Sequence, residues 1–278
     1  MTLDCEVVQT RSGARAMRDR LTGELMHPLG PLSEAQRLYV DASELARRLE
    51  YDASDPLVVW DVGLGAASNA SRAWLCSESR LSPRRHLRII SFDRSLAALD
   101  LALQLEHSED FGLGGSVGDA ARALLCHGRH QTPQTEWELR LGELDATLHA
   151  AREEPADIVF WDPFSPRANP ELWTVGAFSA VRRACRAGAT LHTYSGATSV
   201  RSGLLLAGFA VGLGEPISKG RCATIAATSC EALQNPLDRR WFERLRRSSA
   251  AFPLDAPADA LERIGALGQF ARSDASPR

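Results

Sequence analysis

Short, almost wholly apolar segments alternate with amphipathic segments along most of the chain. The clearest apolar segment runs from Leu57 to Val62, is rich in β-branched residues and ends at Gly63. Six such segments are expected to be strands: 57–62, 86–92, 137–141, 157–161, 190–194 and 209–213. Segments with apolar residues at helical spacing, including 66–76 and 95–105, lie between most of them. Because this alternation is typical of a parallel sheet covered on both faces, we predict a doubly wound, mostly parallel α/β domain over residues 33–230.

The two ends of the chain differ from this central domain. Residues 1–32 are expected to form a β-rich lead-in segment that closes with a turn at 27–31. Residues 33–49 are predicted to begin the domain as a helix with Ser33 at its N-cap. Residues 231–278 are expected to be a helical extension in which five arginines surround Trp241 and Phe242. This arginine-rich helix has two interpretations, a solvated helix that covers the core or a contact with nucleic acid.

Composition and charge exclude several classes of protein. A chain of 278 residues with 44% hydrophobic and 24% charged residues can bury a core, which argues against extensive disorder. The longest apolar stretch, 204–213, is broken by glycines and far shorter than the roughly 20 residues that span a bilayer. Residues 1–10 show no secretory signal, so we expect a cytoplasmic protein without a membrane partner. The formal net charge of -3 argues against general coating of nucleic acid but permits a local basic patch.

The six cysteines are scattered along the chain. They form no Cys-x-x-Cys pair and have no histidine at ligand spacing. This pattern predicts reduced thiols and no metal site.

Acidic residues and glycines mark the carboxyl ends of three predicted strands, where ligands bind in open α/β sheets. The first end reads Asp-Val-Gly-Leu-Gly over 61–65, so that glycines let the backbone approach a ligand before a helix begins. The third glycine of the dinucleotide fingerprint is replaced by Ser68, which argues against a pyrophosphate ligand. At the second end, Asp93 can accept both hydroxyl groups of a ribose, a feature that NAD enzymes and S-adenosylmethionine enzymes share.

The third strand end continues into a loop with three prolines. Asp162 follows the apolar segment 157–161, and Pro163, Pro166 and Pro170 stiffen the residues after it. Prolines reduce the freedom of the unfolded chain and fix neighbouring side chains. A rigid loop beside a cofactor cleft is a candidate for positioning a substrate, whereas the alternative role for Asp162 is a helix N-cap.

The same loop carries a family resemblance. The signature D-x-F-x-P-x-x-N-P-x-x-W of MnmC-type methyltransferases is matched by Asp162, Phe164, Pro166, Asn169, Pro170 and Trp173. Segments 61–69, 90–93, 141–143 and 188–209 resemble further motifs of that family in the same order, and 24–39 resembles the start of its stand-alone bacterial members. Enzymes of this family complete the 5-methylaminomethyl group on the wobble uridine of transfer RNA. The resemblance therefore implies a class I, Rossmann-like S-adenosylmethionine methyltransferase that modifies transfer RNA.

The resemblance also implies roles for individual side chains. Asp162 would orient the substrate amine and help to remove its proton. Asp93 would hold the ribose of S-adenosylmethionine, Glu143 its adenine, and Asp61 the cofactor loop or the methionine amine. The implied cofactor-binding residues are Asp61, Gly63, Gly65, Asn69, Asp93 and Glu143. The implied substrate-binding residues are Phe164, Asn169, Trp173, Arg201, Lys219 and Arg221.

Cofactors and partners follow from the same resemblance. S-adenosyl-L-methionine is the expected co-substrate, and no metal is expected. No flavin is expected either, because the flavin-binding half of two-domain MnmC enzymes has no room in this chain. Transfer RNA is the expected partner, and the pathway can include a separate flavin-dependent enzyme.

Three alternatives to this function stay open. The basic tract of the family is reduced to residues 219–221 here, which allows methyl transfer to another amine or to a small molecule. Ala67 replaces the last glycine of the family's cofactor loop, which allows a binding module without turnover. An NAD-dependent oxidoreductase is disfavoured by Ser68 and by the lack of a Ser/Tyr/Lys catalytic set. Structural roles are expected for His27, His192, Trp60 and Trp161, and Trp173 is either a core anchor or a substrate platform.

Overall fold

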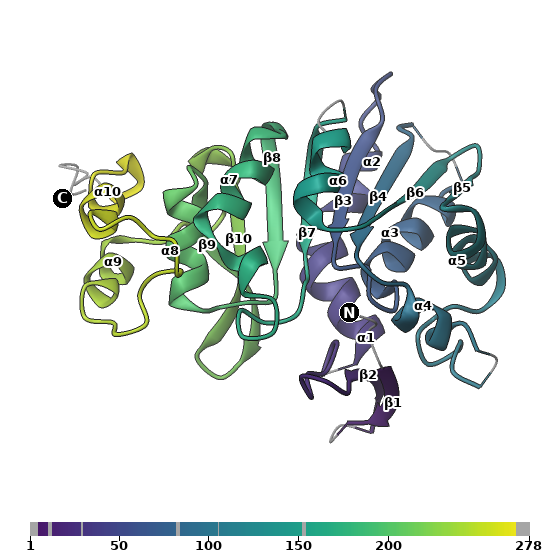
Figure 1. The fold of residues 1–278 in the computed structure, drawn as a ribbon. Helices are drawn as coiled ribbons and strands as arrows, with labels where there is room; N and C mark the ends of the chain where they lie inside the picture. Colours follow the sequence, from purple (N-terminus) through teal and green to yellow (C-terminus); the bar gives the residue numbers. More distant parts are fainter. Residues whose placement is uncertain are drawn as a thin grey trace.

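A single eight-stranded sheet forms the centre of the protein. The computed structural model describes residues 5–10, 13–28, 30–81, 84–104, 106–151 and 154–270. The predicted ranges extend into residues 1–4, 11–12, 29, 82–83, 105, 152–153 and 271–278, which lie outside these described residues. The strands of the sheet are β3 (Leu57–Val62), β4 (Leu87–Asp93), β5 (Arg129–Gln131), β6 (Thr135–Leu141), β7 (Ala156–Trp161), β8 (Cys185–Thr193), β9 (Ala210–Ser218) and β10 (Arg221–Ala227). Their order across the sheet is β5-β6-β4-β3-β7-β8-β10-β9 (Figure 1).

The sheet is doubly wound and mostly parallel, as predicted. Strands β6, β4, β3, β7 and β8 pair in parallel, whereas β5 and β10 are antiparallel to their neighbours. The chain moves outward from β3 to β4 and β6 on one side and then returns to β7 and β8 on the other. Such a reversal leaves a crevice at the carboxyl ends of the central strands, where ligands bind in this class of fold.

Helices cover both faces of the sheet. The helices are α1 (Pro31–Glu34), α2 (Leu45–Leu49), α3 (Ser68–Glu78), α4 (Ala97–Ala102), α5 (Gly115–His127), α6 (Leu144–Ala151), α7 (Val175–Arg183), α8 (Thr198–Leu206), α9 (Arg239–Leu245) and α10 (Ala260–Gly265). The shorter turns are the π-helix η1 (Ala35–Asp41) and the 3-10 helices η2 (Pro170–Trp173), η3 (Cys230–Ala232) and η4 (Gly268–Phe270). No helix in the described part of the chain is long and apolar enough to span a bilayer.

The side chains of β3 show why the central strands are almost wholly apolar. Leu57 and Val59 pack into the core beneath η1 and α2 to α5. Val58 and Trp60 point to the opposite face and pack with α6 to α10. Alternate residues of a strand point to opposite faces, so a strand with helices on both faces must be apolar at every position.

The predicted helix 33–49 is divided in the structure. It begins at Pro31 rather than after a Ser33 cap, and its N-cap residue Gly30 makes no side-chain capping bond. Proline suits the first helical position because its φ is preset and its missing N–H is not needed there. After η1 the backbone of Glu44 takes a left-handed conformation with φ 54°, which ends this helical stretch before α2.

A second difference from the sequence prediction lies at the edge of the sheet. The predicted strand 209–213 extends to Ser218 and turns at Lys219 and Gly220 into β10, which was not predicted. Gly220 has φ 76°, a conformation that suits glycine in a tight turn. Four residues of β9 are exposed, and β10 contains three alanines and one large apolar residue, Ile225, so the apolar pattern of both strands is weak.

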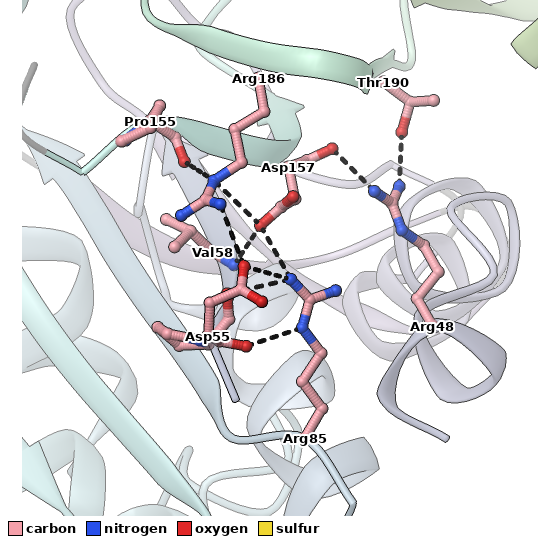
Figure 2. A network of polar contacts seen from close by, with 9 residues as sticks. Arg48, Asp55, Val58, Arg85, Pro155, Asp157, Arg186 and Thr190 are labelled. Atoms are coloured by element: carbon pink, nitrogen blue, oxygen red, sulfur yellow. Dashed lines mark hydrogen bonds and ion pairs between the residues drawn. The ribbon is translucent and has the colours of Figure 1, made fainter. Parts of the chain in front are cut away.

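A charged network closes the amino-terminal edge of the sheet, opposite the crevice (Figure 2). The carboxylate of Asp157 accepts a hydrogen bond from the backbone N–H of Val58 at 2.9 Å. Arg85 and Arg186 each place a nitrogen 3.8 Å from the same Oδ2 atom, and both also contact Asp55 at 3.0 Å. The network therefore ties the start of β3 to the start of β7, while the crevice lies at the other end of the strands.

The lead-in segment forms a small antiparallel hairpin of β1 (Cys5–Gln9) and β2 (Arg15–Asp19). Leu25 then pairs with Arg18 of β2, and the N–H of Met26 donates to the carbonyl of Met17 at 2.8 Å. Figure 1 shows this hairpin below the sheet, on the side toward which the β8 arrow points. The lead-in segment therefore reaches the carboxyl ends of the parallel strands.

The C-terminal extension packs beside the far end of the sheet, where Figure 1 shows α9 and α10. Trp241, Phe242 and Leu245 are buried in the core. Arg239 lies over the ring of Phe242 and forms an ion pair with Glu243. These contacts show that α9 covers the core with its apolar face.

Candidate active site

A cavity of about 650 Å³ lies at the carboxyl ends of β3, β4 and β7. Its walls come from the loop after β3 (63–66), the ends of β4 and β6, the loop after β7 (162–165) and the lead-in segment (23–28). Pockets of roughly 300–1,000 Å³ are typical of small-molecule sites. The cavity therefore coincides with the crevice that the strand order creates.

Asp162 stands at the junction of these walls. Asn69 Nδ2 donates a hydrogen bond to Asp162 Oδ2 at 2.7 Å, and His27 Nε2 lies 2.8 Å from the same oxygen. The hydroxyl of Tyr39 is also a hydrogen-bond partner of Asp162. The Asp162 side chain is only 10% exposed and faces the cavity. It caps no helix, because the next helical turn begins at Pro170, so the N-cap interpretation is wrong.

Glycine is needed at residue 63 because the ends of β3 and β7 lie very close together there. Its φ is 90°, and a Cβ atom there would lie 2.7 Å from the backbone oxygen of Asp162. The N–H of Asp162 in turn donates to the carbonyl of Val62 at 2.9 Å. A side chain at residue 63 would therefore displace the loop that carries Asp162.

Asp93 supports the glycine loop while lining the cavity. Its Oδ2 accepts from the N–H of Gly65 at 2.9 Å, and its Oδ1 accepts from the N–H of Ser95 at 3.1 Å. Burial raises the pKa of Asp93, although these N–H groups act in the opposite direction. Glu143, from the loop after β6, lines the same cavity. Both carboxylates are therefore placed to meet a ligand's hydroxyl or amino groups.

Asp61 lies beneath the cavity and is completely buried. Its Oδ2 accepts a hydrogen bond from the Ser91 hydroxyl at 2.8 Å, and its Oδ1 has no hydrogen-bond partner in the described part of the chain. Burial raises the pKa of Asp61 to about 7, and the charges of Asp162 and Asp93 add to this effect. An unpaired buried carboxylate oxygen costs free energy, and a cationic ligand nearby would reduce that cost.

Four further predicted residues fall into two groups. Phe164, Asn169 and Arg221 line the cavity, together with Gly63, Gly65, Asp93, Glu143 and Asp162. Asn69, in contrast, is buried behind the cavity and acts on Asp162.

Two predicted substrate contacts need correction, and a third residue lies outside the cavity. Trp173 is 3% exposed, packs against Trp161 and Phe178, and donates from Nε1 to the carbonyl of Phe164 at 2.7 Å. It is therefore a core anchor for the loop after β7 and is not positioned to stack on a substrate. Arg201 is 8% exposed and donates to Thr224 and to two backbone carbonyls of β10, so its charge serves the fold. Lys219 lies at the turn between β9 and β10 and is not among the residues that line the cavity.

The structure also brings in residues that sequence reasoning missed. His27 was expected to be structural but lies against Asp162, and Tyr39 and Tyr194 flank the same carboxylate. Their only signal in the sequence was the position of His27 and Tyr39 within the segment 24–39 that resembles the MnmC family. His192, in contrast, is buried away from the cavity beside Thr190, and burial lowers its pKa to about 3, in agreement with a structural role.

Ala67 does not block the cavity. It is completely buried, and its methyl group packs into the core on the α3 side of the sheet. Its backbone is left-handed with φ 63°, so replacing the usual glycine affects the turn rather than the space for a ligand. This methyl group therefore gives no reason to expect a binding module without turnover.

The donor set at the cavity fits S-adenosyl-L-methionine. Carboxylates suit its ammonium and ribose hydroxyl groups, and buried acids near a sulfonium gain a cationic partner. Among the described residues, no cluster of three or more histidine, cysteine, aspartate or glutamate side chains is arranged to hold a metal ion.

Comparison with known proteins decides between the nucleotide ligands that Asp93 left open. Residues 121–229 match a family of S-adenosyl-L-methionine-dependent methyltransferases. The crystal structure of MnmC2 from Aquifex aeolicus is similar over 94% of this chain and 82% of that chain, with 25% sequence identity and a TM-score of 0.73. The chain is an MnmC2-like methyltransferase that depends on S-adenosyl-L-methionine. The resemblance seen in the loop motif is thereby confirmed.

Other solved structures share only the fold with this MnmC2-like chain. A spermidine synthase from Thermotoga maritima covers 96% of this chain and 85% of its own, at 11% identity and a TM-score of 0.51. A spermidine synthase in complex with the transition-state analogue AdoDATO covers 96% of this chain and 86% of its own, at 10% identity and a TM-score of 0.53. The Rossmann-like architecture is therefore shared with enzymes of different chemistry.

Proposed function

We propose that this protein transfers the methyl group of S-adenosyl-L-methionine to the amino nitrogen of a 5-aminomethyl group on the wobble uridine of transfer RNA. The observation that carries the proposal is the carboxylate of Asp162, which Asn69, His27 and Tyr39 hold at the cavity wall. A carboxylate in that place can bind a substrate ammonium and help to remove its proton, which leaves a nucleophilic amine. Because its three partners come from different segments, the carboxylate is oriented before substrate arrives.

The co-substrate would be held by residues at the strand ends. Asp93 would accept the ribose hydroxyls, Glu143 would meet the adenine, and Asp61 would be the charged partner nearest the methionine end. When bound, S-adenosyl-L-methionine supplies a methyl group whose bond to sulfur breaks as the bond to nitrogen forms, with the electron pair remaining on sulfur. The loop at Gly65, fixed by the carboxylate of Asp93, would keep the backbone close to the ligand.

The substrate would enter on the side of the loop after β7. Phe164 offers an aromatic face at the cavity, and the hydrogen bond from Trp173 fixes its carbonyl. Stacking of a base on such a ring contributes about 1–3 kcal/mol. Arg94 and Arg221 line the same cavity, where they would meet phosphate groups of RNA.

A second candidate function is methylation of a small amine that is not part of RNA. The cavity is lined by the six acidic residues Glu24, Glu34, Asp93, Glu143, Asp162 and Glu171, against the two arginines Arg94 and Arg221. This excess of carboxylates favours cationic ligands, which include a free amine as well as the co-substrate.

A methylation assay separates the two functions. Purified protein and S-adenosyl-L-methionine would be incubated with transfer RNA that carries the 5-aminomethyl group, with the isolated aminomethyl nucleoside, or with spermidine, and products would be measured by mass spectrometry. The proposed function predicts that the transfer RNA gains the mass of one methyl group. The rate of this methylation should be about 10²–10³-fold lower with Asp162→Asn. Asp100→Asn, at an exposed position of α4, is the control expected to keep wild-type activity. Methylation of a free amine without methylation of the transfer RNA would contradict the proposal and support the second candidate.

We also propose that another enzyme supplies the aminomethyl group. The reaction needs a primary amine on the base, which the chemistry of a methyltransferase does not create. The family resemblance implies that a separate flavin-dependent enzyme acts in the same pathway, and this enzyme would supply the amine.

A further inference from the structure

The lead-in segment contributes an acid–base group to the candidate active site from outside the α/β domain. The carboxylate of Glu24 accepts hydrogen bonds from both the backbone N–H and the hydroxyl of Ser165, in the loop after β7. The backbone N–H of Met26 is hydrogen-bonded to the carbonyl of Met17 in β2. Between these fixed points and α1 lies His27, so its position is set from both sides.

The backbone of His27 is held in an unfavourable conformation. Its φ is 53°, in the left-handed region, and the N–H of Gly30 donates to its carbonyl at 3.0 Å. A residue with a Cβ atom is disfavoured in this conformation, although histidine tolerates it better than most. The conformation directs the imidazole into the cavity wall, where it is 12% exposed and its Nε2 lies 2.8 Å from Asp162 Oδ2. Strain of this kind is commonly found at functional sites.

The charges around His27 favour its protonated form. Burial by itself lowers the pKa of His27, but the carboxylates of Asp162, Glu34 and Asp61 outweigh burial, so that the pKa is raised. Tyr39 and Tyr194 flank the Asp162 carboxylate. Burial and the charge of Asp162 raise the pKa of both tyrosines. These tyrosines therefore remain neutral, and His27 is the group beside Asp162 that can hold an extra proton near neutral pH.

We propose that His27 is a positioning residue that receives, through Asp162, the proton removed from the substrate ammonium. This inference rests on the proposed function. His27 Nε2 lies 2.8 Å from Asp162 Oδ2 but makes no aligned hydrogen bond within the described residues, so the imidazole must turn slightly toward that oxygen. The ammonium gives one proton to the Asp162 carboxylate, and the proton then passes to Nε2 of a neutral His27. An amine with a free electron pair remains, beside a carboxylate paired with an imidazolium. That electron pair forms the new bond to the methyl carbon, the carbon–sulfur bond breaks, and the imidazolium later loses its proton to water.

The proposal predicts a pH dependence with a definite sign. Only neutral His27 can receive the proton, so the turnover number kcat should rise as pH increases through the raised pKa of His27 and then level off. Below that pKa, His27 is already protonated and paired with Asp162, which makes the carboxylate a poorer acceptor.

The variant His27→Asn tests the proposal, because asparagine tolerates the left-handed backbone but cannot take up a proton. His130→Gln, at a half-buried position of the edge strand β5, is the matched control. Aminomethyl transfer RNA and S-adenosyl-L-methionine would be used at saturation, and kcat and KM measured from pH 5.5 to 9. Urea unfolding would establish that the variant is folded. We expect kcat of His27→Asn to fall about 10–100-fold with KM within about 3-fold of wild type, and the rise of kcat with pH to disappear.

A second measurement does not depend on turnover. The imidazole of His27 would be titrated by NMR in the wild type and in Asp162→Asn, with the signal assigned from its absence in His27→Asn. Loss of the Asp162 charge should lower the pKa of His27, and an unchanged pKa would overturn the pairing on which the proposal stands.

The outcomes separate this proposal from the proposed function. If the wild type methylates the transfer RNA and His27→Asn keeps both its kcat and its pH profile, the role of His27 is overturned while the function stands. If the wild type leaves the transfer RNA unmethylated, the proposed function and the proton transfer fall together, and the NMR titration still decides whether His27 and Asp162 are coupled.

Discussion

Binding of S-adenosyl-L-methionine near neutral pH should release a proton from Asp61. Burial raises the pKa of Asp61 to about 7, so this carboxyl group is about half protonated at pH 7. A cationic ligand beside Asp61 favours its ionised form, because the charge that burial disfavours gains a partner. Complete ionisation on binding would therefore release about 0.5 proton per protein at pH 7, and close to none at pH 9.

Calorimetry measures this number directly. The heat of binding is determined at pH 7 in several buffers, and its slope against the ionisation enthalpy of the buffer equals the number of protons released. Asp61→Asn keeps an acceptor for the Ser91 hydroxyl but removes the titrating group, so its slope should fall toward zero. Asp100→Asn should retain the wild-type slope. A wild-type slope of zero at pH 7, or an equal slope in Asp61→Asn, would refute the reasoning.

The same group should make the ligand-free protein less stable as pH rises. The pKa of Asp61 is raised on folding, so the native state holds its proton more tightly than the unfolded chain between about pH 4 and 7. The corresponding stabilisation is complete below that window and is lost as pH rises through the folded pKa. The pKa of Asp61 rises by about three units on folding, so its protonation stabilises the native state by at most about 4 kcal/mol. Urea unfolding at pH 5 and pH 8 should show a smaller loss of stability for Asp61→Asn than for the wild type.

Three further changes test other parts of the structure. Gly63→Ala should lower the free energy of unfolding by about 2–4 kcal/mol, since its Cβ would lie 2.7 Å from the Asp162 carbonyl; urea unfolding unchanged by the substitution would contradict this. Asp157→Asn should destabilise the protein by about 2–4 kcal/mol because Arg85 loses a buried partner, and the more exposed Asp55→Asn should cost clearly less in the same assay. Arg221→Ala should weaken transfer-RNA binding and reduce its salt slope by about 1 while leaving the nucleoside affinity unchanged, and an unaltered salt slope would remove Arg221 from the RNA contact.

The central sheet could be predicted because buried parallel strands leave a strong signal. The predicted strand 57–62 coincides with β3, since every one of its side chains is buried. Strand β10 leaves a weaker signal, because Ile225 is its only large apolar residue and a tight turn joins it to β9. The break at Glu44 depends on a left-handed backbone at a residue type that usually continues a helix. Packing, rather than local preference, determined these features.

The candidate site could be predicted only where the topology places it. Asp61, Asp93 and the loop of Asp162 converge because parallel strands end at the same edge of the sheet. The rule that parallel strands end at one edge of the sheet does not place His27. This residue belongs to the lead-in segment, whose hairpin is not part of the sheet. Trp173 and Arg201 match the family pattern as well as the residues that line the cavity do, yet both side chains are buried. Trp173 supports the loop after β7, and Arg201 supports strand β10. A motif identifies a segment of the site and leaves open which of its side chains face the ligand.

The acidic character of the site suggests how ligand binding and specificity are linked. Asp61, Asp93 and Asp162 lie close enough that the charges of Asp162 and Asp93 help to raise the pKa of the buried Asp61. The free protein relieves this repulsion partly by proton uptake and partly through His27. A cationic co-substrate and a substrate ammonium relieve it further, whereas a neutral ligand of the same shape leaves it in place. The free energy stored in these carboxylates therefore favours cationic ligands, and demethylated co-substrate, which lacks the sulfonium charge, should bind more weakly and leave more readily.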